Sequence, residues 1–143
     1  MKIITFLIVL ALSVNATSLK NTIYKNAIVE KVTSIYDGDT FRANIKDYPP
    51  IVGNRMAIRI LGIDTPEMRG KCVKEKLLAR DAKKLTVSLL RGAKVIELRN
   101  IKRGKYFRLL ADVYVDGVSI ANELLKAGYA VRYDGGTKID WCN

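Results

Sequence analysis

The chain has 143 residues, enough for one domain with a real hydrophobic core, and a formal net charge of +11 at pH 7. This charge favours an anionic partner, of which nucleic acid is the commonest, although a basic surface can also serve solubility or binding to an anionic envelope. Histidine is absent and there are only two cysteines, which excludes a histidine general base and argues against a zinc site.

The N-terminus has the pattern of a secretory signal peptide. Met1 and Lys2 precede a mainly apolar run over residues 3–14, and a cleavage position follows at about Ala16. This run is too short to span a bilayer as a helix, which needs about 20 residues. We expect a signal peptide at 1–16, a polar arm at 17–26 and a folded domain at 27–143, with no stable membrane association after cleavage. An uncleaved anchor or a buried N-terminal segment is the alternative.

The first half of the domain is predicted to be mostly strand. Residues 27–35 and 40–45 are expected to form two strands on either side of a turn at Asp37-Gly38-Asp39. Residues 47–54 contain two prolines and a glycine, which is typical of a loop. A third strand is predicted over the β-branched, apolar residues 56–63.

A long helix is predicted over residues 71–90, with lysines and arginines opposite an apolar face made of Val73, Leu77, Leu78, Ala82, Leu85 and Leu89. Two further strands, residues 94–98 and 106–115, are expected on either side of a basic turn. Ser119 is expected to cap a short helix over 120–127, followed by an extended segment over 129–133. The pattern predicts an α+β, mainly β fold: a five-stranded OB-type barrel with one long inserted helix and a second short helix.

The two cysteines, Cys72 and Cys142, lie in a chain that is predicted to be exported. Oxidising compartments favour pairing, so we expect a Cys72–Cys142 disulfide. Two free, buried thiols are the alternative.

Three separated segments carry the residues best suited to chemistry: Asp37-Gly-Asp39-Thr40, Arg59 with Asp64-Thr-Pro-Glu67, and Lys105-Tyr-Phe-Arg108. Carboxylates bind hard cations and can accept a proton from water, while guanidinium groups match the geometry of phosphate. Each segment also has a simpler interpretation, respectively a hairpin turn, a helix start and a solvated basic turn. Arg59 lies on an apolar strand, where its charge requires a carboxylate or phosphate partner; a purely structural ion pair would satisfy it equally.

In order and approximate spacing, these segments resemble the staphylococcal nuclease (thermonuclease) family over roughly residues 29–133, and Arg59-x4-Asp64-Thr65-Pro66-Glu67 is the most specific string. The chain departs from the family pattern at Phe107, where the family has a glycine.

The resemblance implies a role for each matching residue. Ca²⁺ would be bound by the carboxylates of Asp39 and Asp64 and the backbone carbonyl of Thr65. Catalysis would rest on Glu67 as the general base for water and on Arg59 and Arg108, which would grip the scissile phosphate. The substrate would also contact Lys105, Tyr106 and Tyr133.

These residues and the resemblance together predict a monomeric, secreted or periplasmic, Ca²⁺-dependent nuclease that hydrolyses DNA and RNA with low sequence specificity. Loose specificity follows if recognition is mainly phosphate charge plus base stacking. Two alternatives remain: a non-catalytic nucleic-acid-binding module on the same barrel, and a basic envelope or matrix protein that binds anionic polymers.

Overall fold

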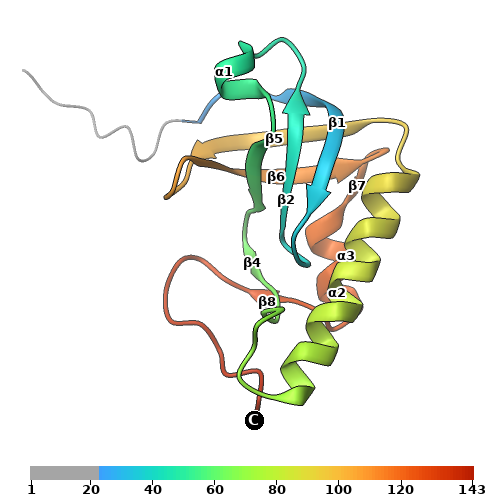
Figure 1. The fold of residues 1–143 in the computed structure, drawn as a ribbon, viewed down its shortest axis with the longest axis vertical. Helices are drawn as coiled ribbons and strands as arrows, with labels where there is room; N and C mark the ends of the chain where they lie inside the picture. Colours follow the sequence, from blue (N-terminus) through green and yellow to red (C-terminus); the bar gives the residue numbers. More distant parts are fainter. Residues whose placement is uncertain (1–22) are drawn as a thin grey trace, which may run out of the picture.

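Five strands close into a barrel in the structure, a computed structural model that describes residues 23–143 (Figure 1). The barrel strands are β1 (Ala27–Ile35), β2 (Thr40–Ile45), β3 (Met56–Ile60), β5 (Ile96–Arg103) and β6 (Arg108–Val115). The predicted signal peptide and most of the predicted polar arm lie outside the described residues. The rest of the arm includes Tyr24, whose backbone N–H donates to the Ile101 carbonyl at 2.8 Å.

One parallel pairing closes this barrel. Strand β1 pairs antiparallel with β2 and β5, β2 pairs with β3, and β5 pairs with β6, all antiparallel. Strand β3 then runs parallel to β6, with Arg59 opposite Leu110 and Ala57 opposite Arg108. Inward-facing residues alternate along the strands, so that Phe41, Ile58, Leu98 and Val113 fill the interior. The predicted mainly β, OB-type barrel is confirmed.

Several element boundaries differ from the prediction. The predicted third strand is interrupted, because Gly62 adopts a φ of +76° that turns the chain between β3 and β4 (Ile63–Asp64). The predicted 47–54 loop contains one short helix, α1 (Pro50–Gly53), which begins at a proline. The predicted basic turn is shorter than expected, since β5 continues to Arg103 through a bulge between Arg99 and Lys102.

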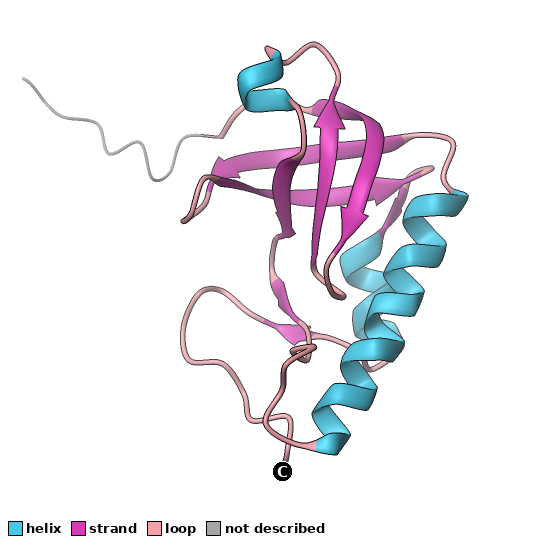
Figure 2. Cartoon of the chain, viewed as in Figure 1, coloured by secondary structure: helices cyan, strands magenta, loops and turns pink. Residues whose placement is uncertain are grey.

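The long helix is α2 (Val73–Gly92), which crosses one side of the barrel (Figure 2). Its buried face agrees with the predicted one only in part. Ala82 is buried and Leu85 and Leu89 pack against the core, but Val73 and Leu77 are exposed. The fully buried residues of the helix are Glu75, Ala79, Ala82, Thr86 and Leu90. The small side chain of Ala82 allows the helix to approach the β1–β2 turn closely. The helix therefore packs through small and polar residues as well as large apolar ones.

Three short elements, β7, α3 and β8, complete the fold. A two-residue strand, β7 (Val118–Ser119), pairs with β6, and Ser119 caps α3 (Ile120–Lys126) by accepting a hydrogen bond from the Asn122 N–H at 3.3 Å. Strand β8 (Val131–Arg132) pairs antiparallel with β4, so that Asp64 lies opposite Val131. Within residues 23–143, we find no helix with the length and hydropathy needed to cross a membrane.

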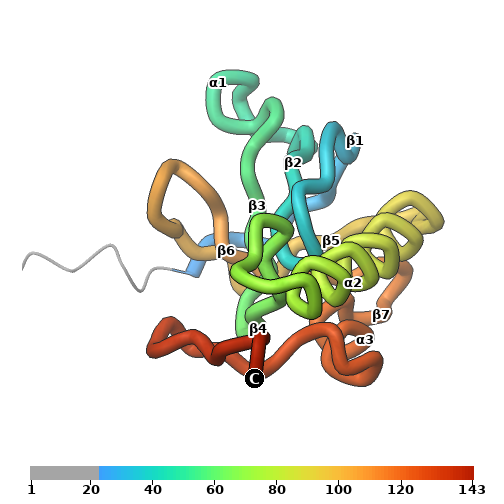
Figure 3. The backbone as a smooth tube through the Cα atoms, turned by 60° about the horizontal axis from the view of Figure 1, so that its bottom comes forward, coloured from blue at the N-terminus to red at the C-terminus, as the bar shows by residue number. Residues whose placement is uncertain are grey.

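The C-terminal segment runs past β4 and ends beside the first turn of α2 (Figures 1 and 3). A Cys72–Cys142 disulfide fastens it there, with the two Cα atoms 6.0 Å apart and a sequence separation of 70 between the cysteines. We use the name C-terminal strap for residues 133–143. The strap is thereby held against the helix start and the β4 region.

This disulfide gives a first prediction. Protein purified without reductant should contain no titratable thiol, and reduction should lower its melting temperature, because the bridge restricts the unfolded chain. For a loop of this length, the chain-entropy contribution is about 4 kcal/mol. Thiol titration and thermal unfolding with and without reductant measure both effects. Two titratable thiols in native protein, or an unchanged melting temperature after complete reduction, would contradict the prediction.

Candidate active site

The β1–β2 turn is held against helix α2 by its backbone. The buried hydroxyl of Thr86 donates to the Gly38 carbonyl at 2.7 Å. A Cβ atom built on Gly38 would lie 2.8 Å from Ala82 Cβ and 2.9 Å from Thr65 Cγ2. Glycine is needed here for close approach, and this contact fixes the positions of the flanking carboxylates of Asp37 and Asp39.

A second prediction follows from this contact. Gly38→Ala should destabilise the protein by about 1–3 kcal/mol, because the added methyl group overpacks the turn against α2. Gly92→Ala is the matched control: its Cβ would meet no atom within 4 Å, so stability should be unchanged or slightly higher. Denaturant unfolding measures both variants. Equal stability of Gly38→Ala and the parent protein would show that the turn is free to move.

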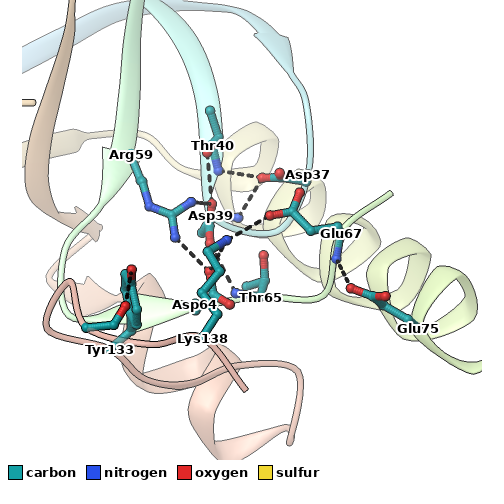
Figure 4. A network of polar contacts seen from close by, with 11 residues as sticks. Asp37, Asp39, Thr40, Arg59, Asp64, Thr65, Glu67, Glu75, Tyr133 and Lys138 are labelled. Atoms are coloured by element: carbon teal, nitrogen blue, oxygen red, sulfur yellow. Dashed lines mark hydrogen bonds and ion pairs between the residues drawn. The ribbon is translucent and has the colours of Figure 1, made fainter. Parts of the chain in front are cut away.

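Arg59 joins the two predicted metal-binding aspartates (Figure 4). Its guanidinium donates from Nη1 to Asp39 Oδ1 at 2.7 Å and from Nη2 to Asp64 Oδ1 at 2.8 Å. Asp39 is buried and accepts further hydrogen bonds from the Thr40 hydroxyl at 2.8 Å and the Thr65 N–H at 3.1 Å. The requirement that Arg59 find an anionic partner is thus met inside the protein.

The carboxylates of this cluster carry more negative charge than Arg59 neutralises. Burial, together with the adjacent charge of Asp39, raises the pKa of Asp37 to about 7. Burial also raises the pKa of Asp39, against the opposing charge of Arg59. Asp37 Oδ1 accepts from the backbone N–H groups of Asp39 and Thr40 at 3.1 and 2.8 Å, which closes the turn. Such a cluster favours the binding of protons or cations.

Glu67 projects from the turn that follows β4, and a buried acid from α2 supports that turn. The Glu67 N–H donates to Glu75 Oε1 at 3.2 Å, and the Lys71 N–H donates to Glu75 Oε2 at 2.8 Å. Glu75 also lies near both cysteines, but their thiols are joined in the disulfide, so this group is no metal site. The side chain of Glu67 itself is half-exposed, so solvent or substrate can reach its carboxylate.

Lys138 of the C-terminal strap reaches into the carboxylate cluster. Its Nζ lies 2.9 Å from Asp64 Oδ1 and 2.9 Å from Glu67 Oε1 (Figure 4). Burial alone would lower the pKa of Lys138, but its hydrogen bonds to Glu67 and Asp64 raise it, so the group stays charged.

A pocket of about 260 Å³ opens beside this cluster. Its lining brings two arginines together with acidic, aromatic and lysine side chains: Tyr36, Asp37, Thr40, Arg59, Glu67, Arg108, Tyr133 and Lys138. Arg108 lies opposite Ala57 in the parallel β3–β6 pair, two positions along β3 from Arg59, and both arginines line the pocket. Within residues 23–143 it makes no ion pair, and its buried Nε has no hydrogen-bond partner. An unsatisfied guanidinium beside a pocket is suited to binding an anion.

A groove of about 590 Å³ continues from the pocket along the barrel wall. Arg59, Arg108 and Tyr133 line both spaces, and Lys105 lines only the groove. Tyr133 is oriented by its backbone N–H, which donates to the Gly62 carbonyl at 3.0 Å, and by its hydroxyl, which donates to the Gly136 carbonyl at 2.9 Å. The groove therefore extends the basic surface beyond the pocket.

The aromatic residues at the β5–β6 hairpin stand apart from both spaces. Tyr106 is 89% exposed and lines neither the pocket nor the groove. Tyr106 and Phe107 have φ values of 56° and 53°, the left-handed conformation in which a family glycine would be unstrained. The Arg103 guanidinium packs 4.1 Å above the Phe107 ring, which helps to hold this unusual turn.

Most of the predicted site residues lie together. The exception is Tyr106, while Lys105 reaches only the adjoining groove. Sequence reasoning missed Lys138 and the two supporting residues on α2, Glu75 and Thr86. The polar character of Glu75 and Thr86 on a buried helix face was a usable signal, but nothing in the sequence around Lys138 pointed to the cluster.

Comparisons with known proteins agree with this geometry. The profile of the family described as Staphylococcal nuclease homologue matches residues 57–139. SPbeta prophage-derived endonuclease YokF of Bacillus subtilis (strain 168) is 40% identical over 98 residues, which cover 66% of this chain and 30% of YokF. Endonuclease YncB of the same organism is 38% identical over 98 residues, covering 66% of this chain and 43% of YncB.

A third relative is the probable endonuclease LCL3 of Phaeosphaeria nodorum (strain SN15), 30% identical over 96 residues that cover 63% of this chain and 32% of LCL3. The matching segment thus spans less than half the length of each of these relatives. The family match itself covers more than half of this chain and includes Arg59, Glu67 and Arg108. The chain therefore belongs to the staphylococcal nuclease homologue family.

Proposed function

We propose that this protein is a Ca²⁺-dependent nuclease that hydrolyses phosphodiester bonds in DNA and RNA with low sequence specificity. The observation that carries the proposal is the pocket in which Arg59, Arg108 and Glu67 meet, with Arg108 lacking an acidic partner within the described chain. A phosphodiester would supply the anion that Arg108 lacks. The names of the relatives, which include two endonucleases of Bacillus subtilis, support the same reaction class.

The residues beside the pocket fit a hard divalent cation. Asp39 and Asp64 are buried carboxylates joined through Arg59, and the adjacent Thr65 hydroxyl is buried with no hydrogen-bond partner within residues 23–143. Oxygen donors of this kind suit Ca²⁺, which tolerates irregular coordination. The carboxylates of Asp39 and Asp64 and the carbonyl of Thr65 would hold the ion. When bound, Ca²⁺ would polarise a phosphate oxygen and lower the barrier to attack.

The protein side chains would then divide the chemical work. Glu67 would accept the proton of the attacking water, because its half-exposed carboxylate lines the pocket. Arg59 and Arg108 would bind the phosphate from one face and neutralise the charge that grows on its oxygens in the transition state. Arg59 would also keep Asp39 and Asp64 in place, through the hydrogen bonds it already makes.

Substrate would be held mainly through its backbone and its base faces. Lys105 lies in the groove that leads from the pocket, where it would meet a neighbouring phosphate. Tyr133 lines both spaces, so it would offer an aromatic face to a base there. Tyr106 is exposed on the β5–β6 hairpin outside both spaces, so it would meet only substrate that extends beyond the groove. Contacts of this kind do not distinguish base sequence, which accounts for the low specificity proposed.

The proposal also places the protein outside the cytoplasm, secreted or periplasmic, as a monomer free of the membrane. The Cys72–Cys142 disulfide supports this location, since such bridges persist in oxidising compartments. Cell fractionation and mass spectrometry of the mature N-terminus test the location. A chain that keeps residues 1–16 and remains in the cytoplasm would contradict it. Light scattering tests the monomer.

A single assay separates the proposed activity from its alternatives. Purified protein is incubated with supercoiled plasmid and with a labelled RNA, in Ca²⁺ and in excess chelator. Cleavage of both substrates only in Ca²⁺ is expected. Binding without cleavage would favour the non-catalytic module, and equal retention of any anionic polymer without cleavage would favour an envelope or matrix protein. Full cleavage in chelator would refute the metal dependence.

A further inference from the structure

We propose that Lys138 is an internal competitor of the divalent cation, held at the metal site by the C-terminal strap, so that the ion must displace its ammonium group in order to bind. This inference rests on the proposed function, and specifically on Ca²⁺ binding by Asp39 and Asp64. It assigns a role to a residue that belongs to none of the three sequence segments described above.

The position of the ammonium group is the first argument. Lys138 Nζ lies 2.9 Å from Asp64 Oδ1, an oxygen of a proposed metal ligand that also accepts from Arg59. A positive charge at that distance from a ligand oxygen repels a second cation and uses one of the oxygen's lone pairs. Ca²⁺ would therefore bind more weakly while Lys138 keeps this contact.

The same ammonium group also engages the proposed general base. Lys138 Nζ lies 2.9 Å from Glu67 Oε1, and it contributes to the lining of the pocket. While Glu67 Oε1 accepts this hydrogen bond, the ammonium group occupies the position beside it that an attacking water would need. One side chain thus restrains both the metal ligand and the base, and its departure would free both together.

The strap explains how a lysine remote in sequence stays at this site. At one end, Tyr133 is fixed to Gly62 and Gly136 by hydrogen bonds, and the Gly136 N–H donates to Asp134 Oδ1 at 3.2 Å. At the other end, Cys142 is bonded to Cys72 at the start of α2. Lys138 lies between these two fixed points. The side chain is about 42% exposed, so it has room to swing out into solvent when a cation arrives.

Calorimetric titration of Ca²⁺ into the full chain tests this inference without measuring activity. Lys138→Met keeps much of the side chain's length but removes its charge. We expect the Ca²⁺ dissociation constant to fall about tenfold, because the ion would no longer have to break the two partly exposed ion pairs of Lys138. Lys138→Arg keeps the charge and should bind Ca²⁺ within about threefold of the parent protein. Lys84→Met is the matched control, because Lys84 pairs with Asp81 on the outer surface of α2 at 3.1 Å. It removes the same charge and should leave the affinity unchanged.

The outcomes separate this inference from the proposed function. Tighter Ca²⁺ binding by Lys138→Met alone supports the competitor role. Equal affinity in parent protein and Lys138→Met would overturn the inference and leave the proposed nuclease intact. An equal gain in Ca²⁺ affinity in Lys138→Met and Lys84→Met would show that only the net charge matters, which would overturn the inference. An absence of Ca²⁺ binding in every variant would overturn both proposals. A loss of cleavage in Lys138→Met with no gain in affinity would show instead that Lys138 serves the substrate phosphate, which also overturns the competitor role.

Discussion

Replacing Glu67 with glutamine is expected to lower the rate of phosphodiester hydrolysis by about 10²–10⁴-fold, the usual contribution of a general base. Glutamine matches glutamate in size, but its amide cannot accept a proton from water. The fold should be retained, because the backbone N–H of residue 67 would still donate to Glu75 and the amide oxygen could still accept from Lys138. Initial rates on plasmid, with Ca²⁺ well above its dissociation constant, measure the effect.

The control for this change is Glu30→Gln, which makes the same substitution at an exposed position of β1. Both variants should unfold at close to the parent temperature, and only Glu67→Gln should lose turnover. Calcium binding should be little changed in either. Near-normal cleavage by Glu67→Gln would remove this residue from the role of base.

The second large effect is expected at the two arginines. Arg108→Lys should lower turnover by about 10²-fold while leaving stability unchanged, because lysine offers no planar fork to phosphate and Arg108 makes no ion pair within the described chain. Arg59→Lys should lower turnover similarly and also lower stability, since lysine has a single terminal nitrogen in place of the separate Nη1 and Nη2 groups that reach Asp39 and Asp64.

Arg42→Lys serves as the control, because Arg42 is an exposed residue of β2 that lines neither the pocket nor the groove. Its guanidinium donates to the Arg55 carbonyl at 3.2 Å. Steady-state kinetics and denaturant unfolding of the three variants separate the two roles. If Arg59→Lys and Arg108→Lys both cleave at the parent rate, the arginines are structural and the proposed transition-state contacts are wrong. A stability loss confined to Arg108→Lys would reverse the assignment of roles.

The parts of this site that sequence predicts best lie in short, locally constrained segments. Asp39 sits in a glycine turn between two alternating strands, and Asp64 and Glu67 lie within four residues of each other. Their relative positions are fixed by chain connectivity and strand pairing, so the sequence motif is enough to predict that these side chains lie close together. The closed barrel was predictable for the same reason, because alternation of apolar residues marks each strand's inward face.

Other features depend on tertiary contacts that produce no periodic pattern in the sequence. Lys138 reaches Asp64 only because the strap is fixed at both ends, and no spacing rule links the two residues. The buried face of α2 was predicted wrongly at its first two turns, where Val73 and Leu77 continue the apolar spacing but are exposed. At the same time Glu75 and Thr86 are buried by specific hydrogen bonds, which hydrophobic periodicity cannot detect.

The parallel β3–β6 pairing has a consequence for how the chain acquires activity during folding. The β1–β2 and β5–β6 hairpins pair strands that are adjacent in sequence, so they can form early. Strands β3 and β6 are separated in sequence by α2 and its connections, so their pairing requires a long loop to close. Closing a long loop costs conformational entropy, which slows the formation of this pairing. The two arginines of the pocket, Arg59 and Arg108, are brought together by this pairing. A refolding chain should therefore recover its helix and hairpins before it can bind a phosphate. We also expect partly folded chains to be unable to cleave nucleic acid in the cell that makes them.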